Sequence, residues 1–164
     1  GTLVPMSEEP VPFGPFLFSV NDVCTASYRA HLGGHGLVST LHDYTRFAQM
    51  LLNGGHLEGT RLLGRRTVDR MATNSIGDLP MVIGDAFGVA LHGDTMGLGV
   101  GIRADRGRFG GLESVGSFGW GGAFNTVFWV DPEEDLIGVV MSQCGMRMDF
   151  LNTCRTLVYQ ALTG

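Results

Sequence analysis

The chain has 164 residues, of which 44% are apolar, so it is long and apolar enough to form one folded domain around a single core. Its formal net charge of −5 at pH 7, without a run of basic residues, argues against nucleic acid and anionic membranes as partners. No apolar stretch is long enough to span a bilayer, and the start carries no basic segment followed by a long apolar one.

Composition and spacing divide the chain into three parts. In residues 1–32, prolines alternate with Phe13, Phe16 and Phe18, which predicts an extended, irregular connecting segment lying on an apolar surface. Residues 33–95 read as a glycine loop followed by a helical segment, and residues 96–164 as antiparallel strands and a C-terminal helix. The sequence therefore predicts an α+β fold.

The helical segment opens with a glycine-rich turn at 33–36. Ser39 or Thr40 can cap the following helix, with Asp43 three residues after Thr40 completing a capping pattern. Apolar side chains then recur at intervals of three and four on one face, namely Leu41, Tyr44, Phe47, Ala48, Leu51 and Leu52. The helix should end at the Asn-Gly-Gly of 53–55. A shorter helix is expected at about 66–72, with Val68 and Met71 turned inward.

The strands follow from alternating and apolar runs. Residues 96–103 alternate glycine with larger residues, as a strand does, and 104–107 read as a turn with no helix after it. A glycine-rich run ending at Ala123, an apolar strand, the polar turn 131–135 and a second apolar strand at 136–141 then predict an antiparallel meander.

An amphipathic helix is expected at the end of the chain, packed on the sheet. Its predicted apolar stripe consists of Phe150, Leu151, Cys154, Leu157, Val158, Ala161 and Leu162. Asn152, Arg155, Thr156 and Gln160 are expected outside that stripe.

Three glycines surround Trp120 in a segment with enough β-forming neighbours to stay extended. Two interpretations remain open. The glycines could let a ligand or another backbone approach the strand, or they could mark a bulge or a tight crossing against a helix.

These segments resemble a known family. Gly-Trp-Gly-Gly-Ala at 119–123, followed by two strands joined by Asp-Pro-Glu-Glu-Asp at 131–135, is similar to the third motif and last strands of the serine β-lactamase-like hydrolases. These are the class C β-lactamases, penicillin-binding proteins and related esterases. The third motif is usually Lys/His-Thr/Ser-Gly, whereas the esterase branch often has the Trp-Gly-Gly found here. Residues 33–40 and 51–55 also resemble the family's glycine loop and helix end.

The resemblance implies the C-terminal part of a β-lactamase-like fold and a role in acyl transfer. In the family, the serine of Ser-x-x-Lys attacks a carbonyl, and the lysine and the tyrosine of Tyr-x-Asn handle the proton. All 11 basic residues here are arginine, so Ser-x-x-Lys cannot occur. Tyr28, Tyr44 and Tyr159 are not followed by asparagine two positions later. We therefore expect a fragment of a serine hydrolase, most similar to an esterase, that is inactive alone.

The same resemblance assigns site residues by position. The backbone N–H of Ala123 would be an oxyanion donor, and Trp120, Gly121, Gly122 and His35 would line the substrate cleft. No cofactor and no metal are implied. The implied partners are a small acyl ester or lactam in the complete protein, and either a second copy or a complementing N-terminal chain at the exposed edge of strand 136–141. A non-catalytic binding or assembly module that keeps the cleft wall is the alternative function.

Other catalytic patterns are weaker. Ser117 does not lie in Gly-x-Ser-x-Gly, and the glycines of 97–101 lack the helix and acidic residue of a dinucleotide-binding motif. His31 and His35, with Asp43 beyond, could suggest a metal, but the glycines between them do not hold that spacing rigid.

The cysteines give no separate signal. Cys24, Cys144 and Cys154 are too few and too irregularly spaced for a disulfide framework or a zinc site. Nothing local marks any of them as an activated nucleophile, so we expect buried thiols.

Overall fold

The computed structural model describes residues 11–13, 16–18, 37–83, 89–90, 93–122, 124–144 and 147–162. Its described helices are α2 (Leu41–Leu52), α3 (Arg65–Met71), α4 (Arg106–Phe109) and α5 (Met148–Gln160). The main sheet contains β7 (Asp94–Met96), β8 (Gly101–Arg103), β9 (Phe118–Gly122), β10 (Thr126–Asp131) and β11 (Leu136–Val140). Three short hairpins pair β1 (Val11–Phe13) with β2 (Phe16–Phe18), β3 (His56–Leu57) with β4 (Thr60–Arg61), and β5 (Val82–Ile83) with β6 (Val89–Ala90).

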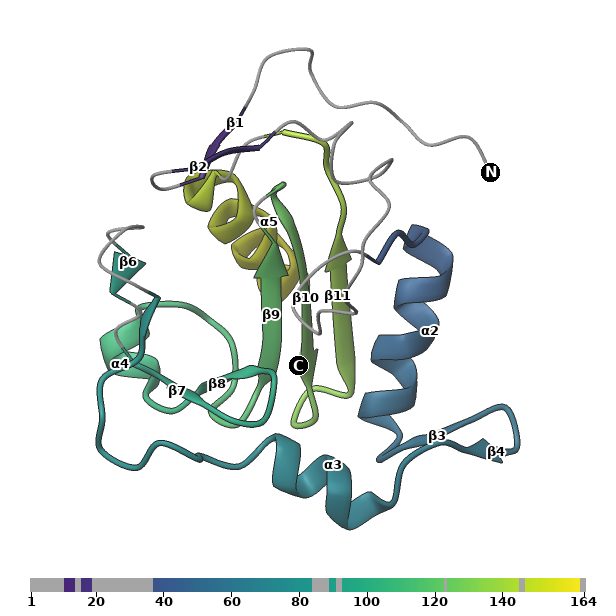
Figure 1. Ribbon diagram of the computed structural model, residues 1–164. Helices are drawn as coiled ribbons and strands as arrows, with labels where there is room; N and C mark the ends of the chain where they lie inside the picture. Colours follow the sequence, from purple (N-terminus) through teal and green to yellow (C-terminus); the bar gives the residue numbers. More distant parts are fainter. Residues whose placement is uncertain are drawn as a thin grey trace.

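The main sheet is antiparallel throughout and has the order β11-β10-β9-β8-β7 (Figure 1). Each strand therefore lies beside its neighbour in the sequence, and the predicted meander is confirmed for β9, β10 and β11. The expected turn between β10 and β11 is present at residues 132–135, and Asp131, predicted to belong to it, is the last residue of β10. β11 is an edge strand, because no described strand pairs with its outer side.

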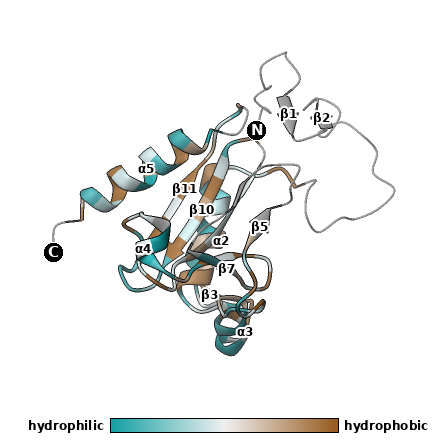
Figure 2. Cartoon of the chain, turned by 90° about the vertical axis from the view of Figure 1, so that its left-hand side faces the viewer, coloured by the Kyte–Doolittle hydropathy of each residue, from teal (hydrophilic) through white to brown (hydrophobic). Residues whose placement is uncertain are grey.

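Two apolar cores lie on opposite faces of this sheet, as Figure 2 shows with α2 on one side and α5 on the other. The buried residues of the α2 face are Ala48, Met50, Leu51, Val68, Val100, Ile102, Phe118, Phe128 and Val130. Those of the α5 face are Val127, Trp129, Leu151 and Tyr159. Alternation along β10 sends Phe128 and Val130 to one core and Val127 and Trp129 to the other. The predicted antiparallel sheet, packed by a C-terminal helix and preceded by a helical segment, is confirmed.

Helix α2 begins where its capping residue predicts. The Thr40 Oγ1 accepts a hydrogen bond from the Asp43 amide at 3.1 Å and donates to the Asp43 carboxylate at 2.9 Å. The helix ends before Asn53, and Gly54 and Gly55 follow in the left-handed region, as glycine permits. Ala48 and Leu51 are buried as expected, whereas Leu41 and Phe47 remain exposed at the border of the packed face.

The predicted strand at 96–103 is wrong, because these residues form a hairpin. β7 ends at Met96, β8 begins at Gly101, and the Gly97 amide donates to the Val100 carbonyl at 2.8 Å across the turn. Gly99 has a φ of +79°, which an extended strand cannot contain. Glycines alternating with apolar residues suit either arrangement, and only the pairing of the two arms distinguishes them. The turn predicted at 104–107, with no helix after it, is also wrong, because helix α4 begins within it at Arg106.

The C-terminal helix is present, but its predicted apolar stripe is only partly correct. Leu151 is buried, whereas Phe150 and Leu157 are 43% and 61% exposed and Leu162 is also exposed. Tyr159 and most of Arg155 lie against the sheet instead. The packed face of α5 is therefore rotated from the predicted one, because polar partners under the helix accept Arg155 and the hydroxyl of Tyr159.

The expectation of buried thiols fails for Cys144, which is exposed, while Cys154 is half-buried and Cys24 lies outside the described residues. No described helix is long and apolar enough to cross a membrane. Most of the predicted connecting segment 1–32 lies outside the described residues, apart from the short β1–β2 hairpin within it.

Candidate functional site

An open strand edge marks the candidate site. On one side, β9 pairs with β10 along the whole length of β9, from Phe118 to Gly122. On the other side, β8 pairs only with Phe118 and Gly119, so Trp120, Gly121 and Gly122 have no partner strand on that side within the described part of the chain. Figure 1 shows β7 and β8 beside only the beginning of β9. Backbone groups at such an edge can hydrogen-bond an extended ligand.

Trp120 borders this edge on the α2 face of the sheet. It lies two residues after the buried Phe118, so the two side chains share a face. The indole is 37% exposed. A Cβ built at Gly101 would lie 3.6 Å from the Trp120 Cζ3, which shows that the ring reaches over β8 at a position without a side chain. Trp120 therefore presents part of an apolar ring to solvent beside the free edge.

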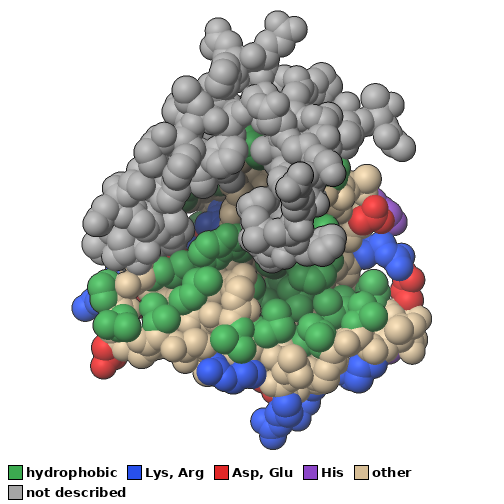
Figure 3. Space-filling view, in the orientation of Figure 1, with side chains coloured by type: hydrophobic (Ala, Val, Ile, Leu, Met, Phe, Trp, Pro, Cys, Tyr) green, Lys and Arg blue, Asp and Glu red, His purple; other side chains and the backbone are tan. Residues whose placement is uncertain are grey.

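The apolar wall continues from Trp120 towards helix α2. Phe128 is the cross-strand partner of Trp120 on β10, and its ring lies 5.4 Å from Tyr44 and 6.0 Å from Phe47, both on α2. Burial against this cluster raises the pKa of the Tyr44 hydroxyl, so Tyr44 is neutral at physiological pH. Figure 3 shows apolar side chains gathered over the coloured part of this face. Most of the charged side chains in that view lie nearer the outline of the molecule.

The glycines around Trp120 have different roles, and one interpretation offered by the sequence, the close approach of another backbone, applies to Gly119. A Cβ at Gly119 would collide with the Phe128 carbonyl, and one at Gly122 would crowd the Thr126 hydroxyl. These two glycines are required by close packing between strands. A Cβ at Gly121 would meet only the Thr126 carbonyl, at 3.5 Å, and Gly121 is exposed. Gly121 is therefore the position that leaves room for a ligand.

The turn that follows β9 is held from behind. Asn125 is completely buried and has a φ of +62°, and its amide donates to the Gly122 carbonyl at 3.1 Å. Its side-chain Oδ1 accepts a hydrogen bond from the Arg147 amide at 2.8 Å, where α5 begins. The Ser142 hydroxyl lies 2.9 Å from the Asn125 carbonyl oxygen and 3.3 Å from that of Phe124.

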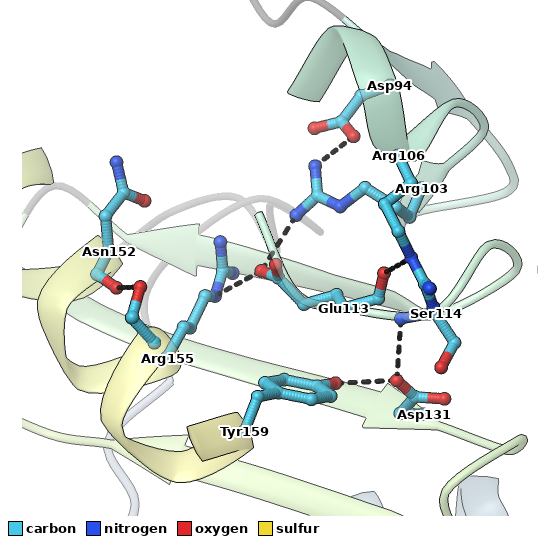
Figure 4. A network of polar contacts seen from close by, with 10 residues as sticks. Asp94, Arg103, Arg106, Glu113, Ser114, Asp131, Asn152, Arg155 and Tyr159 are labelled. Atoms are coloured by element: carbon cyan, nitrogen blue, oxygen red, sulfur yellow. Dashed lines mark hydrogen bonds and ion pairs between the residues drawn. The ribbon is translucent and has the colours of Figure 1, made fainter. Parts of the chain in front are cut away.

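A buried polar network connects the sheet to α5 (Figure 4). Arg103 and Arg155 point towards the Glu113 carboxylate from different sides, at 3.2 Å and 3.7 Å, and Arg103 also pairs with Asp94. The Arg155 guanidinium lies 5.4 Å from the centre of the Trp129 ring. Desolvation by burial raises the pKa of Asp94 despite the neighbouring Arg103, and it lowers the pKa of Arg155.

Asp131 anchors a second part of the same network. Its Oδ2 accepts hydrogen bonds from the Tyr159 hydroxyl at 2.7 Å and from the Ser114 amide at 3.0 Å. Burial alone would raise the pKa of Asp131, but these hydrogen bonds hold it below its usual value. For Tyr159, burial and the hydrogen bond to Asp131 both raise the pKa. Both groups therefore keep their neutral-pH forms, one charged and one protonated.

The structure brings together Trp120, Gly121 and Gly122 at the open edge. His35 and Ala123, the other two predicted site residues, lie outside the described residues. Sequence reasoning missed Asn125, Ser142 and the network around Glu113. The only signal for Asn125 was its residue type, since asparagine tolerates a positive φ better than most residues. Within the described part of the chain, no group of three His, Cys, Asp or Glu side chains could hold a metal ion.

Comparison with known proteins identifies the family. The chain matches the Beta-lactamase family over residues 4–162, so it belongs to the beta-lactamase family. Two proteins of Mycobacterium tuberculosis, the uncharacterized protein MT1414 of strain CDC 1551 / Oshkosh and protein Rv1367c of strain ATCC 25618 / H37Rv, are each 34% identical to it over 116 residues. Each alignment covers 67% of this chain but 28% of the relative.

Solved structures share the fold. EstCE1, described as a hydrolase with promiscuous acyltransferase activity, has a TM-score of 0.70 and 21% identity, covering 97% of this chain and 39% of its own. Simvastatin synthase (LovD) from Aspergillus terreus has a TM-score of 0.62 and 21% identity, covering 84% and 37%. A beta-lactamase (Mb2281c) from Mycobacterium bovis has a TM-score of 0.60 and 24% identity, covering 78% and 44%. The chain thus has the fold of one portion of these longer proteins.

Proposed function

We propose that this chain forms the cleft wall of a serine hydrolase that works through an acyl-enzyme, with esters as its preferred substrates. The observation that carries the proposal is the edge of β9 from Trp120 to Gly122, which no strand among the described residues covers, beside an exposed indole and an uncrowded glycine. An acyl group lying along this edge would meet unpaired backbone groups and an apolar wall. In this proposal the N–H of Ala123, which directly follows the edge in the sequence, is an oxyanion donor, and His35 is a further cleft residue.

The nucleophile and its base would come from outside this chain. The sequence contains no lysine and no Tyr-x-Asn, so both motifs that supply proton transfer in the family are absent from it. The chain spans less than half the length of the relatives and structures described above. We therefore expect it to be inactive alone, since an oxyanion donor without a nucleophile has no intermediate to stabilise.

The uncharged wall favours esters over β-lactams. Trp120 stands where the resembled β-lactamases and penicillin-binding proteins carry lysine or histidine. A β-lactam carboxylate would therefore lose a charge-assisted hydrogen bond, which is typically worth about 1.5–3 kcal/mol. A neutral ester loses nothing at this position, and its acyl chain gains contact with the indole.

The absent groups also support a second candidate, a binding or assembly module that keeps the wall without catalysis. In either case the outer edge of β11 needs a partner, because no described strand covers it. We propose that a complementing N-terminal part of the protein, or a second copy of the chain, pairs there.

Activity measurements on three preparations test the proposal. These are this chain alone, a protein extended upstream to the length of its relatives, and this chain mixed with the upstream part expressed separately. We expect the extended and mixed preparations to hydrolyse p-nitrophenyl acetate, to hydrolyse nitrocefin more slowly, and to lose activity to a serine-directed acylating agent. Turnover by this chain alone, or none by the extended protein, would overturn the proposal, and the second result would favour the binding module.

A substitution tests the role of Trp120 in the extended protein. Trp120→Lys should shift the ratio of nitrocefin to ester turnover towards nitrocefin by about tenfold to a hundredfold, because it restores a cation for the lactam carboxylate. Leu62→Lys is the matched control, since Leu62 is an exposed apolar residue just after β4. An unchanged ratio in Trp120→Lys would show that Trp120 does not border the substrate.

A further inference from the structure

We propose that Asn125 and Ser142 are positioning residues for the cleft wall, because they lock the turn after β9 onto the start of α5. This inference rests on the proposed function, and it adds residues behind the cleft to those that border it. The turn connects β9 and β10 and includes three described residues, Gly122, Phe124 and Asn125. Its front carries the proposed substrate edge, and its back contacts Ser142 and Arg147.

Asn125 combines a backbone requirement with a side-chain requirement. Its φ of +62° suits glycine or asparagine, and glycine would be the simpler choice if conformation alone mattered. The side chain is fully buried, and its Oδ1 accepts the Arg147 amide at 2.8 Å. Arg147 is the N-cap residue, directly before the first residue of α5, so its amide is the point where the turn meets the helix. The side chain of Asn125 thus bonds Arg147, 22 positions away in the sequence, while the backbone amide of Asn125 closes the turn onto Gly122.

Ser142 holds the same turn from the strand on the other side. It lies two residues after the end of β11, and its hydroxyl reaches two successive carbonyl oxygens, those of Phe124 and Asn125. The single hydroxyl proton is shared between them, with the Asn125 oxygen nearer, at 2.9 Å. Ser142 therefore holds two successive peptide groups of the turn next to the end of β11. The Asn125 side chain holds the same turn to the start of α5.

The position of the turn gives these contacts a role in the reaction. Gly122 and Phe124 are the chain neighbours of the proposed oxyanion donor, and both carbonyl oxygens accept a hydrogen bond within this set of contacts. A donor must lie within hydrogen-bond distance of the developing oxyanion, and a displacement of about 1 Å can cost a hundredfold in rate. Loosening the turn should therefore slow turnover more than it weakens substrate binding.

The kinetic experiment uses the extended protein, with active sites counted by stoichiometric reaction with a serine-directed acylating agent so that misfolded molecules do not lower the rate. Asn125→Gly keeps the positive φ and removes the acceptor, and Ser142→Ala removes the hydroxyl. Each should lower kcat per active site by about tenfold to a hundredfold while KM changes little. The conservative variants Asn125→Asp and Ser142→Thr keep the acceptor or the hydroxyl and should retain most of kcat.

A double variant and a matched control show whether the effect belongs to the turn. Asn125→Gly and Ser142→Ala act on the same turn, so their combined effect should be smaller than the product of the single effects. Thr153→Ala removes a comparable side-chain hydrogen bond, 2.8 Å long, from the exposed side of α5. That variant should leave kcat unchanged.

Hydrogen exchange on this chain measures the contacts without requiring activity. The Arg147 amide should exchange faster in Asn125→Gly than in the wild type, and faster exchange of the Asn125 amide is expected in Ser142→Ala. Unchanged exchange in both variants would overturn the lock, and unchanged kcat in an active extended protein would overturn the positioning role. An extended protein that hydrolyses no ester would overturn the proposed function, and the positioning role with it, even where exchange shows the lock to be present.

Discussion

The side chain of Trp129 explains the glycine at position 138, which lies within a strand and not in a turn. It lies opposite Gly119 on β9 and Gly138 on β11, so all three occupy one row across the sheet. A Cβ at Gly138 would collide with the Trp129 indole, and one at Gly119 would collide with the backbone of β10. The indole is almost completely buried under α5 and receives Arg155 above its ring. Gly138 thus leaves room on the α5 face for the tryptophan ring, whereas Gly119 permits the close approach of β9 and β10.

Asp131 and Tyr159 predict how stability depends on pH. The pKa of Asp131 is lowered in the folded state, so its carboxylate stabilises the fold above the unfolded pKa of about 3.9. That contribution is lost as the pH falls through the lower, folded pKa. Tyr159→Phe removes one of the hydrogen bonds to this carboxylate and should lower the free energy of unfolding at pH 7 by about 1.5–3 kcal/mol.

Urea denaturation at a series of pH values between 7 and the acid limit checks this prediction. The loss of stability on acidification should be shallower in Tyr159→Phe than in the wild type, because the folded pKa of Asp131 moves back towards its unfolded value. Tyr44→Phe is the control, since the Tyr44 hydroxyl has no hydrogen-bond partner among the described residues. Equal slopes for Tyr159→Phe and the wild type would contradict the assigned role of Asp131.

Helix α5 is attached to the sheet as much by charge as by apolar packing. Arg155 is 15% exposed and pairs with the buried Glu113, which also receives Arg103. Removing one member of a buried ion pair typically costs about 3–5 kcal/mol, because the remaining charge stays buried. We expect Arg155→Ala to lower the free energy of unfolding by that order, with Glu113 left to share Arg103 with Asp94.

The matched control lies at the start of the same helix. Arg147 pairs with Asp149 at 2.8 Å, but both side chains are about two-thirds exposed, at 65% and 68%. Such surface pairs contribute at most about 1 kcal/mol, so Arg147→Ala should change stability little. It also keeps the backbone amide that Asn125 accepts. Similar losses in the two variants would show that the network around Glu113 is not what attaches α5.

Local signals predicted the elements better than the contacts between them. Helix α2 and the β9–β11 meander were predicted because capping residues, glycines and apolar runs lie within each element. The hairpin at 96–103 was missed because its sequence alternates as a strand does. The packed face of α5 was misjudged because Arg155 becomes buried only through Glu113, which lies 42 positions away (155 − 113) and gives no local signal.

The candidate site divides in the same way. Trp120, Gly121 and Gly122 were identified through their resemblance to a known motif, whose order along one strand is readable from the sequence. Their free edge depends on where β8 stops pairing, and the lock behind the turn joins Asn125 to Ser142 and Arg147. Both features depend on which distant residues contact one another in the fold, and a single sequence does not reveal those contacts.

At the scale of the whole molecule, β11, the residue after it and α5 each carry apolar side chains that are half-buried or exposed. Val139 and Val140 lie half-buried on an edge strand, and Met141, Phe150 and Leu157 are exposed. We expect this chain to self-associate, or to bind a complementing upstream part when one is supplied. Sedimentation velocity across a range of concentrations should show oligomers for the chain alone and a defined heterodimer on mixing.

Two variants locate that interface. Val139→Pro removes a backbone donor from the edge strand, and Leu157→Glu places a charge on the outer side of α5. Each should weaken association if β11 and α5 form the contact surface. Exposed Leu62 on the β3–β4 side provides the control, and Leu62→Glu should have no effect. A monodisperse monomer at high concentration, with slow exchange of the Val139 amide, would contradict the predicted interface.

The order of the strands also has a kinetic consequence. Every strand of the main sheet pairs with its sequence neighbour, and α5 is the next element after β11, so the sheet and its α5 face close over shorter chain segments than the α2 face does. Helix α2, in contrast, packs on β10 and β11, from which it is separated by most of the described sequence. The sheet and α5 should therefore assemble before α2 docks, with φ-values higher for substitutions at Val127 and Leu151 than at Ala48. Equal φ-values on the two faces would indicate that both cores form together, and that the long loop is closed before the barrier is crossed.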